Sequence, residues 1–401
     1  MKKILVMVVT VILLTVMLAS NIVYAEEILF DIVSVNDIIK QTDINNLKAT
    51  AAIMIDSKTG KILFQKNINQ RLPIASLTKI MSMYLIMEAI GNGTVSYDTL
   101  VTASEYAVSF GGSQVYLEKG EQFTLKEMIN AIDLHSANDA TVAVAELIGG
   151  SENAFVQMMN AKAKELGMEN TSYVDCTGLT DEGQYSTAKD LAVLSNALVK
   201  DYPAIFEFST KTYEPFRPGD HQIDLYNRNK LIQFYSGADG LKTGFTTLAG
   251  ECLSATAKRN DFRLVTIVLG EPDTNTRFAE TAKLLDYGFL SFGEITLKEK
   301  NQIAGIIPVE KGIISEVECY VNADSTFLIR LADEKNIERV VTMKESLVAP
   351  VQQDTVIGNV TYMLNGEQLG RVDILTKTSI EKASFFELLW RKILSWFGIK
   401  R

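Results

Sequence analysis

The stretch Pro73-Ile74-Ala75-Ser76-Leu77-Thr78-Lys79 places a serine and a lysine one helical turn apart, at the start of an apolar helix pattern. Proline before the stretch and glycines after the pattern mark its two ends. The apolar residues recur at helical spacing and are Leu77, Ile80, Met81, Tyr84 and Leu85, followed by Gly91 and Gly93. The sequence therefore predicts a mostly buried helix with Ser76 and Lys79 on one face of its first turn.

Two further motifs follow Ser76 in the chain. Ser136-Ala137-Asn138 falls in a short link between helices predicted at residues 124–134 and about 139–148, the first opened by a capping box at Thr124-Leu125-Lys126-Glu127. Lys242-Thr243-Gly244 lies on a predicted strand, ahead of strand-like runs at residues 252–258 and 262–269. Similar matches at residues 58–60, 151–153, 186–189 and 379–382 are explained as turns and helix caps, so the order and context carry the signal.

The three motifs together predict acyl transfer on a serine. A serine hydroxyl becomes a nucleophile when a base takes its proton, and Lys79 is that base if burial and a neighbouring cation such as Lys242 lower its pKa. Ser136 can relay a proton to the leaving amine, whereas Asn138 offers an amide that binds substrate backbone or orients Lys79.

The strand motif predicts a site for a peptide that ends in a free carboxylate. Lys242 and Thr243 can bind that carboxylate, and Gly244 allows a substrate to lie close to the strand. The oxyanion needs two backbone N–H groups, for which we expect those of Ser76 and Phe245. The chain has only two histidines, which makes a Ser-His-Asp triad or a His-ligated zinc site improbable. We therefore expect no metal and no cofactor.

The order of predicted elements indicates an α+β fold, with helices packed on an antiparallel sheet. Strand-like runs at residues 51–55 and 62–65 precede the helices, and more strands follow them. From about residue 295 to 375, short β-rich runs alternate with turns, including an Asn365-Gly366 hairpin signal. We expect a catalytic domain at residues 26–292, a small all-β domain at residues 293–376 and an amphipathic helix at residues 377–401.

The N-terminus predicts an exported protein. Lys2 and Lys3 precede an apolar run at residues 4–18, and Val23-Tyr24-Ala25 supplies small residues before a cleavage point, as in a signal peptide of residues 1–25. The alternative is a retained membrane anchor, which also leaves the body of the protein outside the cytoplasm. The net charge of -10 argues against nucleic acid as a partner.

The C-terminus predicts a helix lying in a membrane interface. Its apolar face carries aromatic residues with basic residues beside it: Phe386, Leu389, Trp390, Ile393, Leu394 and Phe397, with Lys382, Arg391 and Lys392. Aromatic bulk and basic charge together are typical of interfacial helices, and the segment is too short to span a bilayer. Docking of this helix on the β-domain is the alternative. We expect a peripheral protein on the outer face of the cell membrane.

The motifs in context resemble those of low-molecular-mass penicillin-binding proteins of the D-alanyl-D-alanine carboxypeptidase type. The resemblance covers nearly the whole chain and rests on residues 73–79, Ser136-Ala137-Asn138-Asp139-Ala140, Asp239-Gly240-Leu241-Lys242-Thr243-Gly244, Gly178-Leu179, residues 183–186 and Asn227-Arg228-Asn229. It implies a transpeptidase/β-lactamase-like fold, removal of the terminal D-alanine from peptidoglycan pentapeptide stems through an acyl-enzyme on Ser76, and binding of β-lactam antibiotics. Many relatives carry histidine where this chain has Phe245, so a side-chain contact there is lost while the backbone N–H remains.

The resemblance also implies that Arg277 binds the substrate carboxylate, against the alternative of a solvated residue on a predicted helix at residues 275–287. Two other function classes compete. A β-lactamase needs a carboxylate that activates water, and the nearest candidate, Glu214, has no asparagine four residues on. A catalytically dead wall-binding protein has no need of the intact pair Ser76 and Lys79.

Overall fold

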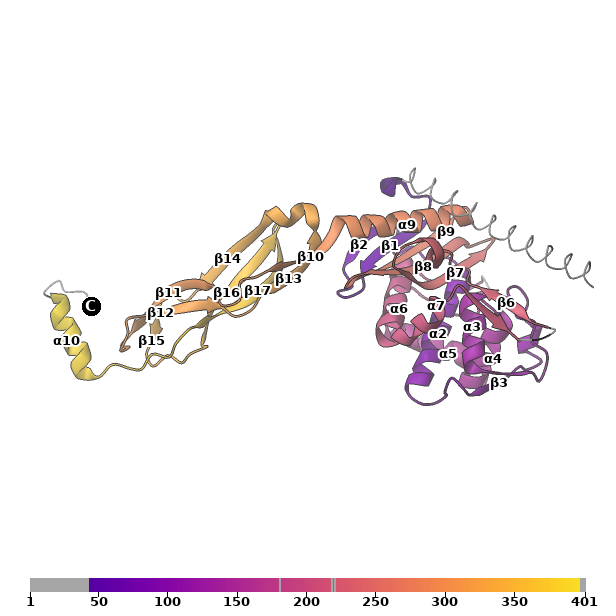
Figure 1. Cartoon of the computed structure of the whole chain (residues 1–401), viewed down its shortest axis with the longest axis horizontal. Helices are drawn as coiled ribbons and strands as arrows, with labels where there is room; N and C mark the ends of the chain where they lie inside the picture. Colours follow the sequence, from indigo (N-terminus) through magenta and orange to yellow (C-terminus); the bar gives the residue numbers. More distant parts are fainter. Residues whose placement is uncertain (1–42, 180–181, 218, 220, 397–401) are drawn as a thin grey trace, which may run out of the picture. The chain divides into compact units, whose positions relative to one another are not determined.

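The structure is a computed structural model that describes residues 43–179, 182–217, 219 and 221–396. The predicted signal peptide lies outside the described residues. Contacts divide the chain into two compact units, Met1–Phe289 and Leu290–Arg401, each of which is described by itself (Figure 1).

The first unit is built on a five-stranded antiparallel sheet with the strand order β2-β1-β9-β8-β7. The strands are β1 (Ala51–Asp56), β2 (Ile62–Lys66), β7 (Ala238–Thr246), β8 (Gly250–Arg259) and β9 (Phe262–Glu271). Helix α9 (Thr274–Ser291) covers one face and the helical cluster covers the other (Figure 1). The central strands are buried on both faces, as expected for a sheet between two helical layers. The predicted α+β class is confirmed.

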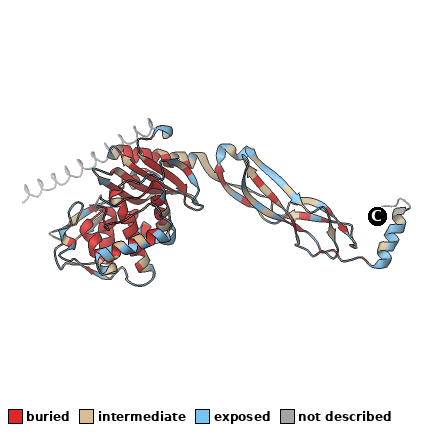
Figure 2. Ribbon diagram, turned by 180° about the vertical axis from the view of Figure 1, so that it is seen from behind, coloured by how far each residue is buried: buried red, intermediate tan, exposed pale blue. Residues whose placement is uncertain are grey.

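The helical cluster surrounds α2, which is buried on nearly all sides (Figure 2). Its helices are α2 (Lys79–Gly91), α3 (Leu125–Leu134), α4 (Asn138–Gly149), α5 (Glu152–Glu165), α6 (Ala188–Asp201), α7 (Phe206–Ser209) and α8 (Leu231–Phe234). Thr124 and Glu127 form the predicted capping box, and Ser151 caps α5. The cap of α6 is Thr187 and not Ser186, because the Thr187 side chain accepts from the N–H of Asp190.

Short elements connect the sheet and the helices. The 3₁₀ segments are η1 (Ile44–Asn46), η2 (Ala75–Thr78), η3 (Ala107–Ser109) and η4 (Pro203–Ile205). Two small hairpin-like sheets pair β3 (Leu100–Thr102) with β4 (Gln122–Thr124), and β5 (Tyr213–Phe216) with β6 (Ile223–Tyr226). The sequence patterns did not indicate these two sheets.

The second unit begins with β strands, as predicted. Strand β10 (Phe292–Leu297) pairs with β13 (Ser325–Arg330), and a six-stranded sheet has the order β14-β16-β17-β12-β11-β15. Its strands are β11 (Ile303–Glu310), β12 (Glu316–Val321), β14 (Ile337–Met343), β15 (Leu347–Val348), β16 (Val356–Leu364) and β17 (Glu367–Thr376), with the 3₁₀ segment η5 (Leu331–Asn336) between β13 and β14. Asn365 and Gly366 both have positive φ and join β16 to β17 in the predicted hairpin.

Helix α10 (Phe385–Trp396) begins later than the predicted segment of residues 377–401, whose last five residues lie outside the described part of the chain. Ile380 is buried and pairs with Val351, so the chain before Ser384 completes the β-domain. Ser384 and Glu387 exchange hydrogen bonds between side chain and backbone, and this capping box begins the helix. Phe397 lies outside the described residues. Among the described helices, none has the length and apolarity needed to cross a bilayer.

Candidate active site

The three motifs meet at one cavity of about 660 Å³ in the first unit. Ser76, Ser136, Thr243, Gly244, Phe245 and Arg277 line it. Lys79, Asn138 and Lys242 lie buried in the same region and contact these lining residues or their neighbours. The structure therefore brings together residues that lie up to 201 positions apart in the chain, from η2 at Ser76 to α9 at Arg277.

The amine of Lys79 is held between three oxygens. Its Nζ lies 3.1 Å from Ser76 Oγ, 2.6 Å from Asn138 Oδ1 and 2.6 Å from the carbonyl oxygen of Thr177. The amide of Asn138 is oriented by its Nδ2, which donates to Gly111 O at 2.7 Å. Carbonyl oxygens accept but cannot donate, so a neutral Lys79 amine gives its two N–H bonds to Asn138 and Thr177. Its lone pair is then left for the hydroxyl of Ser76.

Burial lowers the pKa of Lys79 from 10.5 to about 8, although Cys176, Asp175 and Asp139 partly oppose the shift. About one tenth of the amine is then neutral at pH 7. The sequence predicted two causes, burial and a cationic neighbour. Burial is confirmed as the cause that lowers this pKa, whereas the charged neighbours that act on it among the described residues raise it. The pKa of Lys242 is itself lowered, first by burial and then by the charge of Lys79.

The hydroxyl of Ser136 lies at the cavity without a partner. Ser136 adopts a left-handed conformation with φ of 63°, and its buried Oγ has no hydrogen-bond partner among the residues that the structure describes. Buried polar groups are nearly always paired, so an unpaired hydroxyl beside a cavity is suited to a substrate atom.

The cavity has a cationic wall. Lys242 is buried on β7, and Asp133, which the sequence did not single out, is the acidic residue that opposes the lowering of its pKa. Burial raises the pKa of Asp133 itself. Burial, together with Arg228 and Lys242, lowers the pKa of His135 to about 4. Burial disfavours any charge here, so it is the two cations beside His135, Arg228 and Lys242, that favour an anionic ligand.

Gly244 allows β7 to pass close to the turn that carries Ser76. A Cβ at Gly244 would lie 3.0 Å from the backbone nitrogen of Ser76 and 3.0 Å from the carbonyl oxygen of Ile74. The sequence predicted that Gly244 leaves room for a substrate, but in the structure the backbone at η2 fills that space. It also places the backbone of residues 244–245 beside the N–H of Ser76.

Arg277 is buried at the cavity and is not the solvated helix residue of the alternative interpretation. Its Nη1 forms an ion pair with Glu251 and lies 3.5 Å from Gly244 O. Glu251 is a charged residue at the beginning of β8, directly before the apolar run that starts at Cys252, which is the one sequence signal that could have drawn attention to it.

A second glycine lies close to the backbone of the Ser76 turn. Gly178 has φ of 84°, and a Cβ there would lie 1.9 Å from the carbonyl oxygen of Ala75. Asp175 Oδ1 accepts from the N–H groups of Thr177 and Gly178 at 2.7 and 2.6 Å. This turn presents the Thr177 carbonyl to Lys79, and its role could not be derived from local sequence patterns.

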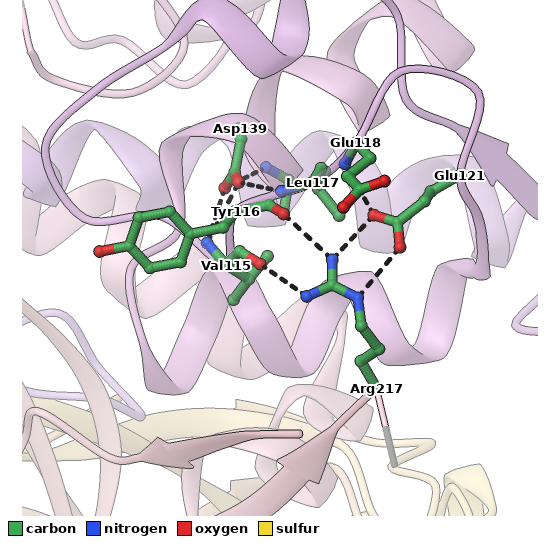
Figure 3. Close-up of polar contacts among 8 residues, drawn as sticks. Val115, Tyr116, Leu117, Glu118, Glu121, Asp139 and Arg217 are labelled. Carbon is green, nitrogen blue, oxygen red and sulfur yellow. Dashed lines mark hydrogen bonds and ion pairs between the residues drawn. The ribbon is translucent and has the colours of Figure 1, made fainter. Parts of the chain in front are cut away.

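The loop of residues 111–121 carries Ser113 to the cavity and is held at two points. Asp139 accepts from the N–H groups of Val115 and Leu117, each at 3.1 Å. Arg217 donates to the carbonyl oxygens of Val115 and Tyr116 at 3.4 and 3.1 Å and pairs with Glu121 at 2.8 Å (Figure 3). The backbone N–H of Asn138 donates to Ser113 O at 2.7 Å, so the loop and the Lys79 contacts form one connected network.

Comparisons with known proteins match each unit to a family model. Residues 38–273 match the family described as D-alanyl-D-alanine carboxypeptidase, and residues 292–382 match the C-terminal domain of penicillin-binding protein 5. The chain is 40% identical over 356 residues to D-alanyl-D-alanine carboxypeptidase DacF of Bacillus subtilis, covering 88% of this chain and 91% of the relative. It is 32% identical over 365 residues to DacC of Escherichia coli, covering 88% and 90%.

Solved structures agree with the sequence comparisons. The D-alanyl-D-alanine carboxypeptidase DacD from Francisella tularensis is similar with a TM-score of 0.70 and 27% identity, covering 84% of this chain and 94% of that one. Penicillin-binding protein D2 from Listeria monocytogenes in its ampicillin-bound form is similar with a TM-score of 0.56 and 33% identity, covering 61% and 98%.

Arg217→Ala should slow acylation of Ser76 by a fluorescent penicillin about 10- to 100-fold, because a loosened loop misplaces the groups around Asn138. The rate is measured by quenching the reaction at a series of times and reading the labelled band by in-gel fluorescence, with circular dichroism as the check on folding. Arg339→Ala removes a comparable arginine–glutamate pair in the second unit and should leave the rate unchanged. Equal rates for wild type and Arg217→Ala would show that the loop holds its position without this side chain.

Proposed function

Because the chain belongs to the D-alanyl-D-alanine carboxypeptidase family, we propose that it removes the terminal D-alanine from peptidoglycan pentapeptide stems through an acyl-enzyme on Ser76. The family places it among the penicillin-binding enzymes of cell-wall metabolism. The observation that carries the proposed mechanism is the hydrogen bond between Lys79 Nζ and Ser76 Oγ, in a cavity shared with Ser136 and Thr243.

Acylation begins when the lone pair of Lys79 takes the proton of Ser76. The Oγ then attacks the carbonyl carbon of the penultimate D-alanine, and the oxyanion accepts hydrogen bonds from the backbone N–H groups of Ser76 and Phe245. The close approach of Gly244 to the Ser76 nitrogen supports this pairing of donors. As the C–N bond breaks, Ser136 donates its proton to the departing amine and receives the proton held by Lys79, which restores the neutral base, and water later hydrolyses the ester.

The terminal carboxylate of the stem peptide binds at the cationic wall. Lys242 on β7 supplies an ammonium group when it is protonated, which burial limits by lowering its pKa to about 7. Thr243 supplies a hydroxyl at the cavity, and Arg277 supplies a guanidinium from α9. Asn138 acts mainly by orienting Lys79, because its Oδ1 and Nδ2 are bonded to Lys79 and Gly111. The exposed side chain of Phe245 offers an apolar surface instead of the polar contact of histidine-bearing relatives.

The same reaction with a β-lactam opens the lactam ring and leaves the antibiotic on Ser76. A β-lactamase would need a carboxylate beside this ester to activate water. Glu214 lies on β5, pairs with Lys211 at 2.8 Å and is not among the residues that line the cavity. Glu251 does line the cavity, but its two oxygens accept from Arg277 and Thr274. This arrangement supports slow deacylation and therefore a penicillin-binding enzyme.

We also propose that residues 1–25 direct export and that α10 holds the protein on the outer face of the cell membrane. Phe386 and Trp390 are 80% and 61% exposed, and Lys392 adds positive charge on the same short helix. The docking alternative has support too, because Arg391 donates to Gly312 O at 2.8 Å and also to Ile313 O. The contact fixes one side of α10 and leaves the aromatic side uncovered.

Ser76→Ala should abolish release of D-alanine from a diacetyl-Lys-D-Ala-D-Ala peptide and prevent labelling by penicillin. The reason is that Lys79 has one hydroxyl, that of Ser76, among its hydrogen-bond partners in the described residues. Chromatography of the released D-alanine measures the first effect, and gel fluorescence measures the second. Ser379→Ala alters the Ser-x-x-Lys match in the second unit and should change neither. Residual D-alanine release by Ser76→Ala would mean that another group is the nucleophile.

Removal of residues 384–401 should abolish binding to anionic phospholipid vesicles while kcat and KM for the soluble peptide stay unchanged. This end point keeps Ile380 and Ala383, which are buried in the β-domain. A second variant, Phe386→Glu with Trp390→Glu, keeps the helix and removes its apolar side. Cosedimentation of both variants with vesicles at the wild-type level would contradict the anchoring role.

A further inference from the structure

The arginine proposed to bind the substrate carboxylate is already paired with a carboxylate of the protein. Arg277 and Glu251 both line the cavity, with side chains only 7% and 14% exposed. Glu251 Oε2 accepts from Arg277 Nη1, and its Oε1 accepts from Thr274 Oγ1 at 2.7 Å. The hydrogen bond from Thr274 therefore helps to hold the Glu251 carboxylate beside the Arg277 guanidinium.

The position of Glu251 follows from the sheet. On β8, Glu251 is the register partner of Phe245 on β7, next to the backbone proposed to bind the oxyanion. Arg277 reaches the same place from α9 and lies 3.5 Å from Gly244 O. Glu251 thus lies at the guanidinium that a substrate carboxylate would also bind, if Lys242, Thr243 and Arg277 form its site.

The Nε of Arg277 is buried and has no hydrogen-bond partner among the described residues. The guanidinium thus retains donor capacity beyond its bond to Glu251. A guanidinium has five N–H donors arranged to bind a carboxylate through two parallel bonds. A second carboxylate at Arg277 also meets the repulsion of the first, since two like charges a few ångströms apart in a partly buried site repel strongly.

We propose that Glu251 is a specificity-determining residue that competes with the substrate's terminal carboxylate for Arg277 and so weakens binding of anionic peptide ends. The inference rests on the proposed function, since it assigns Arg277 to the substrate carboxylate. When the site is empty, Glu251 neutralises a buried guanidinium that would otherwise be unpaired. When substrate binds, the same charge limits the affinity gained from Lys242 and Arg277.

Two probes that differ by one charge test this competition. Benzoyl-D-alanyl thioglycolate ends in a carboxylate, and its methyl ester does not. Each transfers its benzoyl-D-alanyl group to Ser76 Oγ as the C–S bond breaks, and the released thiol is measured with a chromogenic disulfide. The substitution Glu251→Gln keeps the shape and the oxygen that accepts from Thr274 but removes the charge.

For Glu251→Gln, KM for the carboxylate probe should fall about tenfold, with kcat within about twofold of wild type. KM for the methyl ester should stay unchanged. Glu88→Gln removes the charge of the part-buried pair with Lys162, away from the cavity, and should affect neither probe. An unchanged or raised KM for the carboxylate probe would overturn the proposal, as would an equal change for both probes, which is what a purely structural role produces.

The failure of this inference is distinguishable from the failure of the proposed function. A wild-type enzyme that releases thiol from the probes, together with an unaltered KM in Glu251→Gln, overturns the competition alone. A wild-type enzyme that releases thiol from neither probe overturns the acyl-enzyme on Ser76 and the competition with it.

Discussion

The hydrogen bond between the buried amine of Lys79 and the hydroxyl of Ser76 is the interaction on which the site depends. Burial lowers the pKa of the amine to about 8, so a useful fraction is neutral near physiological pH. Two carbonyl oxygens, from Asn138 and Thr177, take its N–H bonds and turn the lone pair toward Ser76. The base is therefore prepared by position and desolvation, and no histidine is needed to activate the serine.

The surrounding fold serves to hold this amine and the Ser76 turn together. Gly178 and Gly244 let backbone approach the turn closely, at places where a Cβ would lie 1.9 and 3.0 Å from its atoms. Asn138 links the amine to the loop of residues 111–121, which Asp139 and Arg217 fasten in turn. Close packing of this kind gives the reacting groups a fixed geometry before substrate arrives.

The sequence predicted the features that local patterns control. Helical spacing located α2, although Ser76 lies in the 3₁₀ segment η2 before it and not in the first turn of the α-helix. The Thr124 capping box located α3, and Asn365-Gly366 located a hairpin, because each signal depends on neighbouring residues. The ion pair of Glu251 with Arg277 joins residues 26 positions apart in sequence, and Asp133 reaches Lys242 from another element. Such contacts are set by tertiary packing. The sheets of β3 with β4 and β5 with β6 were missed because runs of three or four residues show no clear alternation.

The most direct test of the account is the pH dependence of acylation by the methyl ester of benzoyl-D-alanyl thioglycolate. This probe has no carboxylate to bind Lys242 and Arg277, so the pH dependence of its rate does not include the protonation of a carboxylate site and reports the base. The neutral amine is the active form, so the rate should rise tenfold per pH step below a midpoint at about pH 8 and level off above it, after subtraction of the Ser76→Ala background. A midpoint near the usual lysine value of 10.5, or a rate that does not change between about pH 6 and 9, would contradict a desolvated lysine base.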